Sequence, residues 1–182
     1  MEIDRVSAQI LRAVIGEEPA PKPARRKRTD SADADHWTPA ILLERAAYLR
    51  ELARAGDGQA SETLREYPQH RAMLCFRSRN GEVEVHEKWA DVFYVISGAA
   101  KLVTGGTVCG ARQSGPGEIR GGAIERGTSR ELRTGDLVHI PAGTPHQFLV
   151  SAEKTITCLV MKIQESEAIE HAGLSAAGAT LP

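Results

Sequence analysis

The spacing of apolar residues changes along the chain and divides it into zones. Within residues 1–18, apolar positions recur every three or four residues, which predicts an amphipathic helix. Residues 19–36 lose this period and are rich in Pro, Ala and charge, so we expect a flexible linker. The basic run at residues 25–28 is either part of this solvated linker or a patch for an anionic partner.

A second helical pattern opens the segment 37–68. Thr38 is a suitable cap, Pro39 suits the first helical position, and Gly56 suits the end of the helix. The apolar side of this helix is supplied by Ile41, Leu42, Tyr48, Leu49 and Leu52. We expect the segment to pack on the domain that follows it or on a second subunit.

Residues 69–163 have the pattern of short β-strands separated by turn residues. The predicted strands are 71–79, 82–87, 91–97, 99–104, 130–134, 136–140, 146–151 and 155–163. The pair Asn80-Gly81, between the first two strands, is typical of a tight hairpin turn. Many short strands without intervening helical periods predict an all-β sandwich or barrel.

Two further segments contain few apolar residues. Residues 105–129 are glycine-rich and long for a connection inside a compact β-domain, which is typical of functional lids or mobile loops. Residues 164–182 are rich in Ala, Glu and Gly, and this composition predicts a frayed tail.

The overall composition argues against nucleic acid and membranes as partners. The 182 residues carry a formal net charge of -1 and 4% aromatic residues, so no nucleic-acid-binding surface is indicated. The first residues lack the apolar core of a secretory signal, and no run is long enough to span a bilayer. Three widely spaced cysteines without a CxxC pair argue against a cysteine zinc site. We expect a cytoplasmic protein that binds neither nucleic acid nor membrane.

Histidines and carboxylates recur at positions where strands begin or end. Glu84 and His86 are two residues apart on a predicted strand, so their side chains point to the same face. Asp91 opens the next strand, and His146 follows a turn at residues 141–145. Burying such groups inside an apolar barrel is costly unless a cation compensates them. Imidazoles with carboxylates suit a divalent Mn, Fe, Zn or Ni ion.

Two motifs in this region resemble those of the cupin superfamily. The first reads Glu84-x-His86-x4-Asp91-x6-Gly98, and the second reads Gly135-x5-Pro141-x-Gly143-x2-His146. The resemblance implies an all-β fold, a double-stranded β-helix (jelly-roll or cupin barrel) over residues 69–163, with an N-terminal α-helical extension. The gap between the two motifs is longer than usual for the family, and residues 105–129 account for the excess.

The resemblance also implies a metal ligand set. His86 and His146 match the ligands of the family pattern directly. Asp91 matches by chemical similarity, and Glu84 matches by position alone, because the family usually has His there. A site of two imidazoles and two carboxylates favours Mn(II) or Fe(II), with Zn(II) or Ni(II) as further options.

Three other residues are candidates for the lining of a substrate pocket. His139 lies on the strand before Pro141 and is either a support for the metal ligands or an ordinary core or surface residue. Glu118 and Arg120 lie in the glycine-rich segment and form either a binding pair for a substrate carboxylate or a surface ion pair.

Three functions are compatible with this chemistry. The first is a metal-dependent enzyme of the dioxygenase, isomerase or lyase type, which acts on a small molecule. The second is a non-catalytic cupin that binds a metabolite as a sensor, and the third is a partner-binding module that uses residues 1–36. Exposed sheet edges and the helical extension lead us to expect a homodimer.

Overall fold

The computed structural model describes residues 34–165, which form one helix and twelve strands. The predicted helix in residues 1–18, the linker with its basic run up to residue 33, and the tail beyond residue 165 lie outside the described residues.

The described helix, α2 (Pro39–Ala55), begins and ends where the sequence indicates. Thr38 caps it by accepting a hydrogen bond from the backbone N–H of Ile41 at 3.3 Å, and Gly56 is the C-terminal cap. Its buried residues are Ala46, Leu49 and Ala53, and they pack against Leu74 and Phe76 of the sheet. The helix therefore covers the outer face of the strand that carries Leu74 and Phe76.

The segment assigned to the helical extension also contains a strand. Residues 59–66 form β1 (Gln59–Glu66), which pairs antiparallel with β2 (His70–Arg77) over its full length. The sequence pattern ends the helix at Gly56 but indicates no strand between it and residue 69, so β1 was not predicted. A partner strand from later in the chain decides the conformation here, and the local sequence has no strong period of its own.

The remaining strands are short, apart from β4 and β12. They are β3 (Val83–His86), β4 (Trp89–Thr104), β5 (Thr107–Cys109), β6 (Arg112–Gly115), β7 (Glu118–Gly121), β8 (Ala123–Glu125), β9 (Thr128–Arg133), β10 (Leu137–Ile140), β11 (His146–Leu149) and β12 (Ile156–Gln164).

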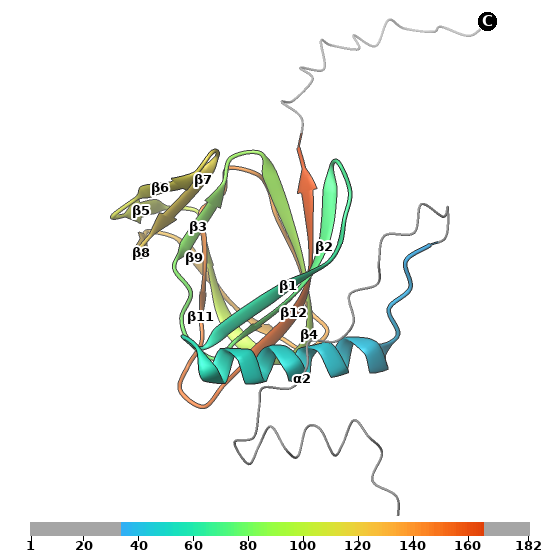
Figure 1. The fold of residues 1–182 in the computed structure, drawn as a ribbon. Coiled ribbons are helices and arrows are strands. Elements are labelled where there is room, and N and C mark those ends of the chain that lie inside the picture. Colours follow the sequence, from blue (N-terminus) through green and yellow to red (C-terminus); the bar gives the residue numbers. More distant parts are fainter. Residues whose placement is uncertain (1–33, 166–182) are drawn as a thin grey trace, which may run out of the picture.

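These strands form a sheet that curls on itself. Its order is β1-β2-β12-β4-β11-β3-β7-β6, with β9 and β10 also paired to β4, while β5 and β8 form a separate pair. Figure 1 shows β1, β2 and β12 on one side of the curl and β3, β11 and β7 on the other, with α2 running below. The predicted fold class, a double-stranded β-helix with a helical extension, is confirmed.

The long strand β4 belongs to both sides of the curl. Its first part pairs with β12 and β10, and its second part pairs with β11 and β9. The change occurs at Gly98, where φ is +87° and a Cβ atom would lie 2.0 Å from the carbonyl oxygen of Thr155. The predicted strands 91–97 and 99–104 are therefore one strand, which bends at a glycine that no other residue could replace without displacing the backbone.

The predicted hairpin at Asn80-Gly81 is wrong. β2 pairs with β1 and β12, whereas β3 pairs with β11 and β7. The Gly81 N–H donates to the carbonyl oxygen of Phe148 at 2.9 Å, and Asn80 Oδ1 accepts from the Val150 N–H at 2.8 Å. The two residues therefore carry the chain from one side of the curl to the other.

The glycine-rich segment 105–129 is not an unstructured excursion. It contains β5, β6, β7, β8 and the start of β9. Four consecutive residues of β7 pair with β3, so this segment extends the sheet next to the strand that carries Glu84 and His86. The expected lid is replaced by a fixed wall of the barrel.

Replacing Leu49 with Ala should lower the free energy of unfolding by about 2–5 kcal/mol, because this side chain is fully buried between helix and sheet. Leu43→Ala on the same helix, where the residue is 55% exposed, should change it by less than about 0.5 kcal/mol. Urea unfolding followed by circular dichroism measures both values. Equal losses would contradict the described packing of α2.

Candidate metal centre

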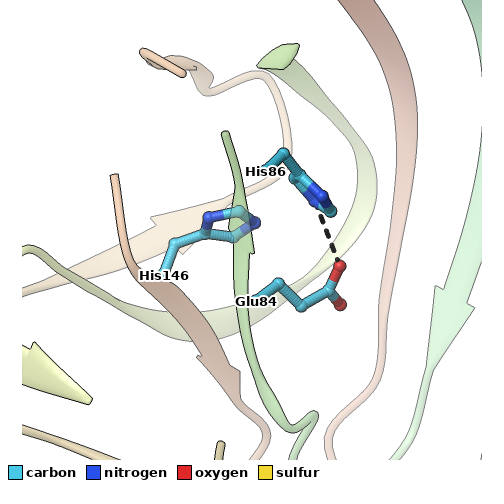
Figure 2. A group of neighbouring side chains, drawn as sticks. All are labelled: Glu84, His86 and His146. Carbon is cyan, nitrogen blue, oxygen red and sulfur yellow. Dashed lines mark ion pairs between the residues drawn. The ribbon is translucent and has the colours of Figure 1, made fainter. Parts of the chain in front are cut away.

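Three side chains of the kinds that can bind a metal ion converge inside the curled sheet. The donor atoms of Glu84, His86 and His146 all lie within 4.8 Å of one another, and both imidazoles are buried. Figure 2 shows the three side chains pointing toward one another from β3 and β11. This group is compact enough for all three side chains to bind one ion.

Strand alternation and one turn bring these residues together. Val83 and Val85 are buried on one face of β3, which leaves Glu84 and His86 on the other. Glu84 is also the direct partner of His146 across the β3–β11 pair. In the turn before β11, Gly143 has a φ of +72° and donates its N–H to the carbonyl oxygen of His86 at 2.8 Å. The turn is thereby tied to the end of β3.

The hydrogen bonds of the two imidazoles direct their other nitrogens to a common point. His86 Nδ1 lies 2.6 Å from Glu118 Oε2, and His146 Nδ1 lies 3.1 Å from the carbonyl oxygen of Thr144. Both partners are acceptors, so we assign the ring proton to Nδ1 in each case. The two Nε2 atoms are buried, and neither has a hydrogen-bond partner among residues 34–165. Their lone pairs are free for a cation, the arrangement usual for metal-binding histidines.

Asp91 lies next to both imidazoles. Its Oδ2 is 3.3 Å from His86 Nε2 and 3.4 Å from His146 Nε2. Two ligands bonded to one metal at about 2.1 Å and roughly 90–110° would be about 3.0–3.4 Å apart, so Oδ2 has the spacing of a further ligand. The other oxygen, Oδ1, lies 2.7 Å from Lys162 Nζ. This ion pair holds the carboxylate with Oδ2 toward the imidazoles.

The buried charges shift the pKa values of these groups in the metal-free protein. Burial lowers the pKa of His86, but Asp91 and Glu84 outweigh it and raise that pKa to about 9. Burial raises the pKa of both carboxyls, yet the imidazoles, Lys162 and the neighbouring arginines hold them well below their usual range. At neutral pH the carboxylates are ionised, and without a metal His86 carries a proton in its place.

The other predicted pocket residues have different outcomes. Glu118 and Arg120 lie on β7 opposite His86 and Glu84, and both line the cavity beside the cluster. Glu118 orients His86, and Arg120 Nη2 lies 3.7 Å from Glu84 Oε2. His139 does not line this cavity: its side chain is 55% exposed and faces Glu165. His139 lies on the outward face of β10, which explains why its side chain is outside the cavity.

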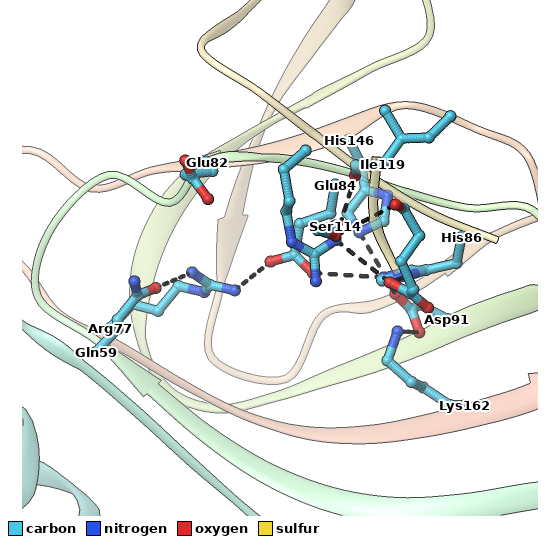
Figure 3. A network of polar contacts seen from close by, with 12 residues as sticks. Gln59, Arg77, Glu82, Glu84, His86, Asp91, Ser114, Ile119, His146 and Lys162 are labelled. Carbon is cyan, nitrogen blue, oxygen red and sulfur yellow. Dashed lines mark hydrogen bonds and ion pairs between the residues drawn. The ribbon is translucent and has the colours of Figure 1, made fainter. Parts of the chain in front are cut away.

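Sequence reasoning missed three cationic residues of the cavity. Arg71 and Arg77 come from β2, and Lys162 comes from β12. Figure 3 shows Arg77 and Lys162 beside the cluster. Alternation along β12 would have placed Lys162 on the same face as Cys158 and Val160. The signal on β2 is ambiguous, because α2 covers its outer face and both faces of the strand are partly buried.

The two sequence motifs occupy the strands that build this centre. The first forms β3 and the start of β4, and the second forms β10, the following turn and β11. Their histidines meet inside a curled antiparallel sheet whose sides are joined by β4. The fold is a double-stranded β-helix, the barrel that the two motifs predict. Within residues 34–165, this barrel has no helix that is long and apolar enough to cross a membrane.

No family model and no curated protein matches the chain. Among solved structures, the barrel is similar to the polyketide cyclase RemF from Streptomyces resistomycificus, with 20% identity over 59% of this chain and 66% of that chain and a TM-score of 0.43. The chain thus spans just under two thirds of RemF. It is also similar to KdgF from Halomonas sp. (17% identity, 61% and 84% covered, TM-score 0.44) and to the cupin domain of Cnp3 from Schizosaccharomyces pombe (10%, 59% and 65%, 0.44).

In protein stripped of divalent ions by a chelator, stability should fall as the pH rises from about 6.5 toward 9. The folded pKa of His86 lies above its ordinary value of 6.5, so its contribution is complete below 6.5 and is lost as the pH passes about 9. Urea unfolding at pH values on both sides of this window measures the loss. His86→Gln should flatten the dependence, and His139→Gln, at an exposed position, should leave it unchanged. A dependence that survives in His86→Gln would contradict the assignment.

Proposed function

We propose that the protein is a metal-binding cupin that binds a small molecule beside one divalent ion and acts on it as a metal-dependent enzyme. The observation that carries the proposal is the pair of buried Nε2 atoms of His86 and His146, which lack hydrogen-bond partners among the described residues and face the same carboxylate oxygen of Asp91. Each unsatisfied buried polar group costs about 1–3 kcal/mol, and a shared cation removes that cost.

The chemistry of the donor set indicates which ions fit. Two imidazole nitrogens with the carboxylates of Glu84 and Asp91 form a nitrogen–oxygen set without sulfur. Such a set favours Mn(II) or Fe(II), and Zn(II) or Ni(II) are also compatible with it. The bound ion would supply Lewis-acid or redox chemistry to a chelating substrate.

The protein groups around the cluster have separable tasks. Glu118 holds the ring of His86, and Lys162 holds Asp91. Arg77 joins the two sides of the curl through a contact of 2.7 Å with Glu84. A cavity of about 630 Å³ next to these residues provides room for a small molecule. Dioxygenase, isomerase and lyase reactions are all compatible with this arrangement.

A non-catalytic metabolite-binding cupin is the second candidate. The ion pairs of Arg77 with Glu84 and of Lys162 with Asp91 favour it, because they reduce the negative charge that the carboxylates offer to a metal. The two candidates are distinguished by turnover, since only the enzyme converts its ligand in the metal-loaded state.

Protein purified without chelator should contain a near-stoichiometric divalent metal by elemental analysis. His86→Ala and His146→Ala should each abolish metal retention, because each removes a nitrogen ligand at the centre of the cluster. His139→Ala is the matched control, since that side chain is exposed and outside the cavity. Circular dichroism verifies that the variants are folded. A folded His146→Ala protein with unchanged metal content would refute the site.

Removing the support of His86 should weaken metal binding without abolishing it. Glu118→Ala should lower the metal affinity about 10- to 100-fold, because the imidazole loses the acceptor that fixes its proton on Nδ1. Glu118→Gln keeps an oxygen acceptor and should lose less. Competition with a fluorescent chelator measures the affinities. Equal affinities of the wild type and Glu118→Ala would exclude this role for Glu118.

A further inference from the structure

The cavity beside the cluster contains more cationic than anionic side chains. It is lined by the cations Arg71, Arg77, Arg120 and Lys162 and by the carboxylates Glu84, Asp91 and Glu118. The four cations exceed the three carboxylates by one charge. A divalent ion at the cluster would add two more positive charges. The described lining residues then leave a clear positive surplus for a ligand to neutralise.

Three of the four cations already have carboxylate partners. Arg77 Nη2 lies 2.7 Å from Glu84 Oε1, Lys162 Nζ lies 2.7 Å from Asp91 Oδ1, and Arg120 Nη1 lies 3.4 Å from Glu118 Oε2. These pairs account for every carboxylate that lines the cavity. Among these four cations, Arg71 is therefore the one that has no carboxylate partner in residues 34–165.

Arg71 has no ion pair among residues 34–165, and its Nε is buried without a hydrogen-bond partner there. The guanidinium lies over the indole ring of Trp89, with Cζ 5.4 Å from the ring centroid. An aromatic face holds the cation in place but provides no acceptor for its N–H groups. Among residues 34–165, the guanidinium of Arg71 is thus held in position without an acidic partner.

The sheet aligns Arg71 with the metal cluster. In the strand register, Lys162 is the partner of Arg71 on β2 and of Asp91 on β4. The Cα atoms of Arg71 and Asp91 are therefore two strand spacings apart, about 10 Å. The neighbouring row, Met73, Val160 and Phe93, also lines the cavity and is apolar. The cavity thus has a cationic end, a metal end and an apolar surface beside them.

We propose that Arg71 binds the carboxylate of a small organic acid whose other polar end lies at the metal cluster. The planar fork of a guanidinium matches a carboxylate with two parallel hydrogen bonds. The cavity volume of about 630 Å³ and its apolar row fit a carbon skeleton, which an inorganic anion lacks. The placement of the second end rests on the proposed function, whereas the carboxylate contact at Arg71 does not need the metal.

The test compares succinate with its neutral analogue succinamide by isothermal titration calorimetry, on Mn(II)-loaded and on chelator-treated protein. The wild type should bind succinate saturably and at least about tenfold more tightly than succinamide, since a charge-assisted pair is lost with the amide. Arg71→Gln should weaken succinate binding about 10- to 100-fold in both metal states. Arg71→Lys should lose part of this affinity. Arg130→Gln, at an exposed residue of β9, is the matched control and should bind like the wild type.

The outcomes separate this inference from the proposed function. Metal binding together with equal succinate affinity of the wild type and a folded Arg71→Gln overturns the inference alone. Absence of metal binding with Arg71-dependent succinate binding overturns the proposed function and supports the carboxylate site. Inorganic phosphate that binds as tightly as succinate, with the same dependence on Arg71, overturns the organic-acid class. Absence of saturable succinate binding to the wild type also overturns the inference.

Discussion

Two imidazole nitrogens buried without a described protein partner are the constraint on which the candidate site depends. The Nδ1 of each ring faces a hydrogen-bond acceptor, so the Nε2 atoms of His86 and His146 point toward a common position. The carboxylates of Glu84 and Asp91 lie beside them. Such a group needs a positive charge at its centre, and either a proton on His86 or a metal ion provides it.

The frame of the barrel makes this arrangement possible. β3 and β11 are neighbours, which places Glu84 directly opposite His146. β4 bends at Gly98 and belongs to both sides of the curl, so Asp91 reaches the site from the opposite wall. β7 then adds Glu118 behind His86. Residues that are far apart in the chain thus become successive partners across one sheet, which fixes their spacing more tightly than loops would.

The cavity combines this centre with a second kind of chemistry. Ion pairs of Arg77 with Glu84 and of Lys162 with Asp91 lie in its wall, and they hold these carboxylates in place. Arg71 differs from the other cations because its partner is an aromatic ring. In the proposed metal-bound state, the ion and the guanidinium of Arg71 would together select ligands that carry negative charge at a defined separation.

Local chemistry explains which features the sequence predicted and which it missed. The shared face of Glu84 and His86 follows from strand alternation, and the turn before His146 follows from its Pro and Gly residues. The pairing of β7 with β3 and the crossing at Asn80-Gly81 depend on distant partners, so no local signal indicates them. The position of Arg71 in the cavity was not predicted, because a helix covers the other face of its strand and the sequence therefore shows no clear alternation. The expected homodimer and the cytoplasmic location stay predictions.

The most direct test of the account is the position of a bound ion in crystals of the Mn(II)-loaded protein, located by anomalous scattering. The account predicts one strong peak at bonding distance, about 2.0–2.3 Å, from the Nε2 atoms of both His86 and His146. A peak that touches only one of these nitrogens, or an ion bound elsewhere while both imidazoles keep their places, would contradict it.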